Sequence, residues 1–293
     1  MYPIRYLKGV TNMCYAEQSK FLTSGQDNKI KIWNSFEDMN SEVILVEAQI
    51  TSIAYQKNSI YVANNLMQLK HYNLQTKEDL GVLDYCSAQI TTISVNELNT
   101  LVFTGLANNQ IKLIDIKAKK ITTIIGHEAT IFQICLDPLE KYFVAACSNG
   151  AVRFWTQKNF QNVHSLINRK NKINNNNFWK MAWHKSGNII AVPCRHKVNF
   201  YERSTWQNKF NIRIFENTVS FCEFSPDITK VLIGTLKQIV FIFSIITKRE
   251  CFRFSFNENW IICSLAWNPE NEKQIIFCDK IGNLSDLKIE YKV

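Results

Sequence analysis

Glycine and proline are scarce in this chain: 293 residues contain nine glycines and five prolines. Long apolar runs are also missing. The longest, IVFIFSII at 239–246, is far shorter than the roughly 18 residues of a membrane-spanning helix. The N-terminal stretch MYPIRYLKGV lacks the apolar core of a secretory signal. We therefore expect neither a membrane protein nor a secreted one.

Closely spaced cysteine pairs are absent. Nine cysteines are scattered along the chain without any C-x-x-C motif, and most lie in apolar, strand-like runs such as FQICLD and FVAACS. A zinc site or a disulfide framework would need short paired spacings. We interpret the cysteines as free, buried thiols in a reducing compartment, and we expect no metal or other cofactor.

Catalytic motifs are missing as well. The sequence contains no G-x-S-x-G, no G-x-x-x-x-G-K-[ST] and no G-x-G-x-x-G. His127-Glu128 begins an H-E-x-x-H pattern, but position 131 is isoleucine. Without a nucleophile–base pair or a phosphate loop, we expect no enzymatic activity and no small-molecule substrate.

A recurring turn and strand dominates what is present. SNGAVRFW (148–155) has close copies in QDNKIKIW (26–33) and ANNQIKLID (107–115). The repeated strand ends fall at Trp33, Lys70, Ile114, Trp155, Tyr201, Phe243 and Leu287, at intervals of 37 to 46 residues. A period of about 40–45 residues with several short strands is typical of WD40 propellers. The repeat predicts an all-β, seven-bladed WD40-type β-propeller.

The layout of one repeat predicts how the ring is built. YFVAACS (142–148) is almost continuously apolar, as expected for a strand covered on both faces, and Asn149-Gly150 is a strong hairpin turn. With glycine scarce, we expect asparagine at positive φ. The last repeat ends near Ile289 without a fourth strand, so we expect residues 2–8 to supply it and close the ring. No linker divides the chain, which predicts a single domain over 1–293.

One repeat resembles the complete WD repeat. Gly126-His127 opens the fourth unit and Trp155 closes it. The resemblance implies a hydrogen-bonded structural tetrad of His127, Ser148, Asn149 and Trp155, with asparagine in place of the usual aspartate. Elsewhere the pattern is weak: no second Gly-His occurs, no Trp-Asp dipeptide survives, and Lys70 stands at a tryptophan position.

Three longer stretches, 126–155, 179–206 and 259–284, carry a narrower resemblance. Their motifs include AW..SG at 182–187 and LAWNP, followed by GNL, in the last unit. The chain is similar to the N-terminal WD-repeat domain of the replisome-adaptor family called acidic nucleoplasmic DNA-binding protein, or chromosome transmission fidelity factor four. The resemblance implies a nuclear protein of DNA replication and sister-chromatid cohesion, and we expect this domain to be a platform on which replication factors dock. It also implies a trimerising region and, in animals, an HMG box, both outside these 293 residues.

Basic charge is concentrated in one segment. The net charge is +9, and residues 168–213 hold ten Lys and Arg against the single acid Glu202. In a propeller, the loop between two blades emerges on the same face as the turn between the second and third strands. We therefore predict one basic patch, made of Arg169, Lys170, Lys172, Arg195, His196 and Lys197, with Lys185 and Arg203 on the opposite face.

The basic patch has three interpretations. It could hold the phosphate backbone of DNA, independently of base sequence. It could equally hold an acidic peptide of a protein partner, or be an ordinary solvated surface. A ubiquitin-ligase substrate receptor is a further alternative, but such proteins carry Trp-Asp-x-Arg where this chain has WNSF and WTQK.

Overall fold

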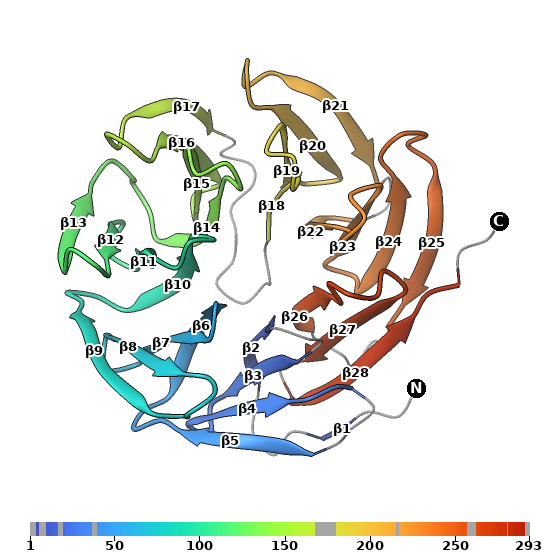
Figure 1. Cartoon of the computed structure of the whole chain (residues 1–293). Coiled ribbons are helices and arrows are strands. Elements are labelled where there is room, and N and C mark those ends of the chain that lie inside the picture. Colours follow the sequence, from blue (N-terminus) through green and yellow to red (C-terminus); the bar gives the residue numbers. More distant parts are fainter. Residues whose placement is uncertain are drawn as a thin grey trace.

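The structure is a computed structural model that describes residues 4–5, 10–16, 20–36, 40–167, 180–214, 217–256, 262–279 and 281–290. In these ranges the chain forms strands and no helix, and hence no helix able to cross a membrane. Seven four-stranded sheets stand radially around a central axis (Figure 1). The predicted seven-bladed, all-β propeller is confirmed.

The first four blades each use four consecutive strands. Blade one contains β2 (Val10–Tyr15), β3 (Phe21–Gly25), β4 (Lys29–Trp33) and β5 (Ser41–Leu45). Blade two contains β6 (Ile50–Gln56), β7 (Ser59–Asn64), β8 (Gln68–Asn73) and β9 (Asp79–Tyr85). Blade three contains β10 (Ile90–Val95), β11 (Leu101–Leu106), β12 (Ile111–Asp115) and β13 (Lys120–Ile124). Blade four contains β14 (Ile131–Leu136), β15 (Tyr142–Cys147), β16 (Ala151–Thr156) and β17 (Asn162–Ile167).

The last three blades complete the ring. Blade five contains β18 (Ala182–Trp183), β19 (Ile189–Cys194), β20 (Lys197–Glu202) and β21 (Asn208–Arg213). Blade six contains β22 (Val219–Phe224), β23 (Lys230–Thr235), β24 (Ile239–Ser244) and β25 (Glu250–Ser255). Blade seven contains β26 (Ile262–Trp267), β27 (Gln274–Asp279) and β28 (Asn283–Lys288), and β1 (Ile4–Arg5) is its fourth strand.

The N-terminal strand closes the ring as predicted. β1 runs antiparallel to β28, with Ile4 opposite Leu284 and Arg5 opposite Asn283. Blade one then packs on blade seven, because Val10 and Phe21 share a buried cluster with Ile276. The two ends of the chain therefore meet in one blade, which removes the seam that an open row of sheets would leave.

The middle strands show why these sequences become blades. In β15 the residues from Phe143 to Cys147 are fully buried. Successive side chains of a strand point to opposite faces. Phe143 and Ala145 therefore pack with blade three, while Val144 and Ala146 pack with blade five. An almost continuous apolar run is the expected sequence for a strand buried on both faces.

Strand register corrects one predicted repeat position. Trp33 lies opposite Phe21 in blade one, and Trp155 lies opposite Phe143 in blade four. The matching pair in blade two is Ile60 and Tyr72. Tyr72, two residues after Lys70, therefore holds the tryptophan position, and the prediction that Lys70 holds it is wrong. The other six strand ends named from the repeat lie on the third strands at their expected places.

The tetrad predicted around Trp155 is only half assembled. The rings of His127 and Trp155 are in contact, with centroids 5.3 Å apart, and His127 Nδ1 lies 3.0 Å from Cys147 Sγ. Ser148 and Asn149 lie beyond the end of β15, where Asn149 Oδ1 accepts a hydrogen bond from the Ala151 N–H. Within the described ranges, Trp155 Nε1 and His127 Nε2 are buried without a hydrogen-bond partner.

Blade one explains the missing bond. There Trp33 Nε1 donates to Thr23 Oγ1 at 3.0 Å, and Thr23 lies opposite Lys31 in the sheet. The residue at the same register in blade four is Ala145, which lies opposite Arg153. Alanine has no hydroxyl to accept the indole N–H. The predicted tetrad therefore placed the hydroxyl at Ser148, three residues beyond the position that faces the tryptophan.

Positive backbone φ is shared among several residue types. Asn28, Asn58, Asn99 and Asn109 have positive φ, in agreement with the expectation for asparagine. Four lysines do as well, among fifteen such non-glycine residues in the described ranges. Asparagine thus replaces glycine at some turns but not at most of them. Gly150 has φ of 83°, as the Asn-Gly turn requires.

A series of ion pairs ties consecutive blades together. The residue two before the tryptophan position is basic in each of the first four blades: Lys31, Lys70, Lys112 and Arg153. Lys70 Nζ lies 2.6 Å from an Asp79 oxygen and 3.4 Å from Glu47, which belongs to the connection from blade one. Lys112 binds Asp84 of blade two at 2.7 Å, with both side chains largely buried. Removing one member of such a pair would leave an uncompensated buried charge.

Two substitutions at equivalent positions should change stability in opposite directions. Thr23→Val keeps the side-chain shape but leaves Trp33 Nε1 without an acceptor, at a cost of about 1–3 kcal/mol. Ala145→Ser supplies a hydroxyl beside the unpaired Trp155 Nε1 and should add about 1 kcal/mol. Urea unfolding of both variants measures the two effects. A shift of both in the same direction would contradict the shared register.

His127 should make the fold sensitive to acid. Burial, with a smaller contribution from Arg153, lowers the pKa of His127 to about 4, below the unfolded value of about 6.5. The unfolded chain therefore binds the proton more readily, and stability should fall by about 2–3 kcal/mol as pH drops from 6.5 to 4. Unfolding of His127→Gln across this range checks it, since the variant should lose that part of the pH dependence. An unchanged pH profile in the variant would show that His127 is not responsible.

Candidate partner-binding surface

The connections between blades and the turns between second and third strands lie on one face of the ring, here called the connector face. Backbone hydrogen bonds join the two sets: the Val46 N–H donates to the Asn28 carbonyl, and the Ile214 N–H donates to the His196 carbonyl. The same pairing joins Cys86 to Met67. The geometry assumed for the predicted basic patch is therefore correct for the described blades.

Half of the predicted basic patch can be placed on this face. Arg195 and His196 form the exposed turn between β19 and β20, and Lys197 begins β20. His196 Nδ1 donates to the Asn217 carbonyl at 3.1 Å. Arg169, Lys170 and Lys172 lie outside the described residues, so their part of the patch stays a prediction.

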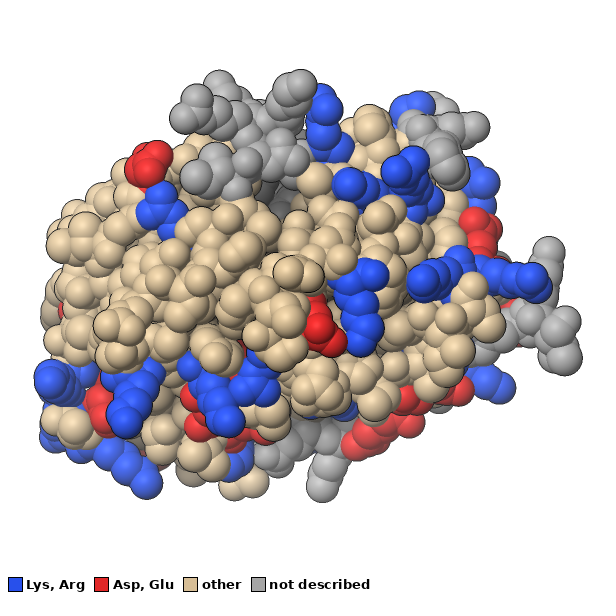
Figure 2. Space-filling model, turned by 90° about the horizontal axis from the view of Figure 1, so that it is seen from above, with Lys and Arg blue, Asp and Glu red and all other residues tan. Residues whose placement is uncertain are grey.

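Strand pairing adds a cation that the predicted basic patch did not include. Arg213, the last residue of β21, lies directly opposite Lys197 and is exposed. Arg195, Lys197 and Arg213 thus lie together, and none of them forms an ion pair with another described residue. These three residues are called the blade-five basic cluster. In Figure 2, Lys and Arg side chains gather at the upper right of the view, on the side of the molecule where Figure 1 shows β21, with few acids among them.

Three other basic residues of the 168–213 segment form ion pairs. Lys180 lies 2.9 Å from Glu223, and Lys209 lies 3.2 Å from Glu202. Arg203, predicted on the opposite face, lies 3.5 Å from the buried carboxylate of Asp137 and stacks on the Tyr142 ring. Arg203 therefore joins blades four and five instead of offering a free charge. Lys185 is exposed in the β18–β19 turn on the opposite face, as predicted.

A cavity of about 400 Å³ lies among the first strands of blades three to six. Its polar groups mainly bind one another. The Gln133 side chain bonds both backbone groups of Met181, at 2.7 and 3.0 Å, and Lys180 pairs with Glu223. Burial raises the pKa of the lining Cys135 to about 12, so its thiol stays protonated at neutral pH. The cavity has room for a side chain or solvent, and Cys135 is not an activated nucleophile.

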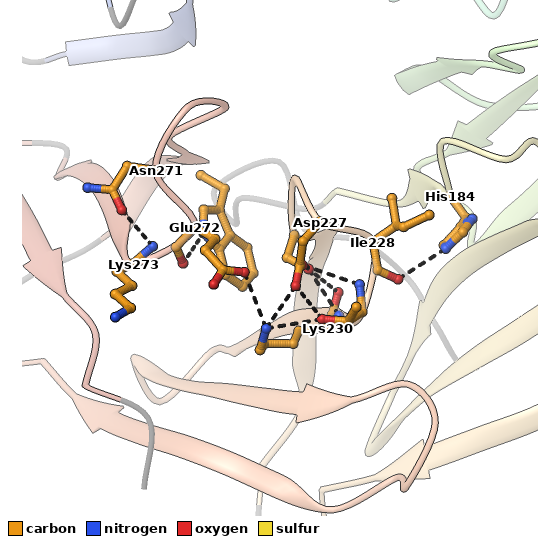
Figure 3. Close-up of polar contacts among 10 residues, drawn as sticks. His184, Asp227, Ile228, Lys230, Asn271, Glu272 and Lys273 are labelled. Atoms are coloured by element: carbon orange, nitrogen blue, oxygen red, sulfur yellow. Dashed lines mark hydrogen bonds and ion pairs between the residues drawn. The ribbon is translucent and has the colours of Figure 1, made fainter. Parts of the chain in front are cut away.

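A polar network links blades five, six and seven at the turns opposite the connector face. Figure 3 shows Lys230 between Asp227, at 2.9 Å, and Glu272, at 3.4 Å. His184 Nε2 donates to the Ile228 carbonyl at 3.2 Å. Hydrogen bonds from Ser225, Thr229 and Lys230 outweigh the effect of burial and hold the pKa of Asp227 well below its usual range. The charged groups of this network pair with one another across neighbouring blades, so we interpret the network as structural.

The comparison with protein families agrees with this geometry. A family model described as the first WD40 domain of WDHD1 matches residues 4–285, which is nearly the whole chain. The chain belongs to this family. The match therefore also covers blades one, two, three and six, which lie outside the three stretches that carry the resemblance in the sequence.

Several curated proteins are similar to the chain. WD repeat and HMG-box DNA-binding protein 1 from Homo sapiens is 25% identical over 298 residues, covering 98% of this chain and 26% of the relative. The Xenopus laevis protein of the same name is 26% identical, covering 96% and 26%. Protein HIR1 from Candida albicans is 21% identical, covering 92% and 31%. The chain thus spans about a quarter of the length of the first two relatives.

Proposed function

We propose that this WD40 domain is a non-catalytic protein-interaction platform of a nuclear DNA-replication adaptor. The family match over residues 4–285 carries the proposal, together with relatives whose names describe HMG-box DNA-binding proteins. The closed ring suits display because each blade is held by two neighbours. Loops on such a ring keep fixed relative positions, which lowers the entropy lost when a partner docks.

The blade-five basic cluster is the binding surface that we assign to an acidic segment of a protein partner. Arg195, Lys197 and Arg213 come from a turn and two paired strands, so the fold holds them side by side. Clustered charges without local partners attract an oppositely charged segment and speed its association. The guanidinium groups of the two arginines can each bind a carboxylate through two parallel hydrogen bonds.

Direct DNA binding is the second candidate, and the same cluster supports it. Arginine and lysine hold phosphate oxygens as readily as carboxylates, without reading base sequence. Such binding would weaken steeply with salt, because each neutralised phosphate releases condensed counterions. The salt dependence of binding therefore separates DNA binding from docking of a short peptide.

The adaptor role can be tested in replicating cells. The full chain, fused to a promiscuous biotin ligase and expressed in dividing eukaryotic cells, should enter the nucleus and label replication proteins more strongly in S phase than in G1. The ligase carrying only a nuclear import signal is the control. Exclusion of the fusion from the nucleus, or labelling equal to that of the control, would contradict the proposed function.

The cluster itself can be tested with purified protein. Arg195→Glu with Lys197→Glu should weaken binding of a fluorescent Glu-rich 15-residue peptide at least tenfold at 0.15 M salt, by charge repulsion. Lys158→Glu with Lys185→Glu makes the same change in net charge at exposed turns of the opposite face and should change binding less than twofold. Anisotropy titrations measure both variants.

The same titrations with a 20-base-pair duplex test the DNA candidate. If DNA binds at the cluster, the double variant should lower the slope of log K against log salt by about 2, one for each lost phosphate contact. A duplex that binds both variants and the unmodified chain with equal slope would exclude the cluster as a DNA site. Equal loss of peptide affinity in both variants would exclude it as a peptide site.

A further inference from the structure

The last residue of the outer strand occupies the same place in successive blades. Leu45 lies opposite Lys29 at the end of β5, and Tyr85 lies opposite Gln68 at the end of β9. In blade three, Ile124 pairs with Ile111, so Ile125 holds the equivalent place directly after β13. Figure 1 shows β5, β9 and β13 as the outer strands of three adjacent blades.

These three positions carry large apolar side chains that the fold leaves in water. Leu45 is 72% exposed, Tyr85 70% and Ile125 74%. The same register holds Arg213 in blade five and Ser255 in blade six, so the propeller does not need an apolar residue there. Single exposed apolar residues are common, but three at one structural position in adjacent blades form a pattern.

Two further exposed residues belong to this surface. Leu66, 55% exposed, and Met67, 40% exposed, form the turn between β7 and β8 in blade two. The Cys86 N–H donates to the Met67 carbonyl, which brings this turn beside the end of β9, where Tyr85 lies. Leu45, Leu66, Met67, Tyr85 and Ile125 are together called the apolar arc.

The charges around the apolar arc are unequal in exposure. Glu47 and Glu128, in the connections that follow Leu45 and Ile125, have side chains that are 74% and 75% exposed. Their basic partners, Lys70 and Arg153, are only 5% and 16% exposed. The half-buried Lys29 and Asp27 in the β3–β4 turn offset each other. At this surface the carboxylates of Glu47 and Glu128 are therefore exposed to solvent, while the cations that pair with them are largely buried.

We propose that the apolar arc is a second docking surface, which takes a partner segment whose apolar side chains alternate with lysine or arginine. The apolar side chains of the segment would cover Leu45, Tyr85 and Ile125, and its cations would reach the outward oxygens of Glu47 and Glu128. The arc lies on the connector face, but on other blades than the blade-five basic cluster. The two halves of one face thus select segments of opposite charge.

Three fluorescent 12-residue peptides test the chemistry of the arc: alternating Leu and Lys, alternating Leu and Glu, and alternating Ser and Lys. The Leu–Lys peptide should bind at least tenfold more tightly than the other two. Leu45→Ser with Tyr85→Ser should remove this preference. Leu98→Ser with Ile246→Ser, at positions 61% and 81% exposed on the opposite face, should leave binding within twofold of the unmodified chain.

Several results would overturn the proposal. Equal binding of the Ser–Lys and Leu–Lys peptides would show that charge alone attracts the segment, and tighter binding of the Leu–Glu peptide would show the wrong charge preference. Unchanged affinity in the Leu45→Ser, Tyr85→Ser variant, with its unfolding midpoint unchanged, would place the binding elsewhere. A concentration-dependent dimer in light scattering that this variant abolishes would identify a second copy of the chain as the occupant instead.

Discussion

Burial of each middle strand on both faces is the constraint from which the rest of the structure follows. Side chains of β15 alternate between a cluster shared with blade three and a cluster shared with blade five. The apolar faces of a blade are therefore buried only when both neighbouring blades are in place. A row of blades buries the faces of its first and last members only when these two pack on each other. The short pairing of β1 with β28 supplies that meeting. Its two residues complete the seventh sheet.

Polar groups that enter these interfaces are held by a different set of partners in each blade. Blade one has an indole-to-hydroxyl hydrogen bond between Trp33 and Thr23, whereas blade four has alanine in place of the threonine, and His127 contacts the Trp155 ring and Cys147 Sγ. Lys70, Lys112 and Arg153 form ion pairs with residues of the preceding blade or of the connection that follows it, and Arg203 forms one with the buried Asp137. The ring tolerates this variety because apolar packing, which is not directional, provides most of its stability.

The connector face carries the basic side chains and the exposed apolar side chains that the contacts between blades do not use. Blade five presents Arg195, Lys197 and Arg213, which form no ion pair with another residue that the structure describes, while blades one to three present apolar side chains beside exposed carboxylates. Both surfaces use connector-face positions at which the repeat accepts different residue types: the end of the outer strand holds Leu45, Tyr85 and Ile125 in three blades, but Arg213 and Ser255 in two others. This is why two surfaces of opposite character can share one regular scaffold.

Much of this architecture could be predicted from the residues. The 40-residue period, the apolar run around Val144, the Asn149-Gly150 turn and the unassigned N-terminal segment indicated seven blades and their closure, since these features depend on neighbours in sequence. The tetrad hydroxyl and the position of Lys70 were misassigned by two or three residues. Strand register depends on β-bulges and on turn lengths, and neither can be read from the spacing of residues along the chain.

The candidate surfaces depended still more on the tertiary structure. Arg195 and Lys197 could be named from the excess of basic residues, but Arg213 joins them only through strand pairing, and Arg203 is removed by Asp137 in the neighbouring blade. The apolar arc is invisible in the sequence, where Leu45, Tyr85 and Ile125 are forty residues apart and resemble core residues. The sequence by itself determined the repeat and its apolar strands, because burial follows local alternation. Only the tertiary structure decided which charges remain unpaired and which apolar side chains remain in water, because both depend on contacts between blades.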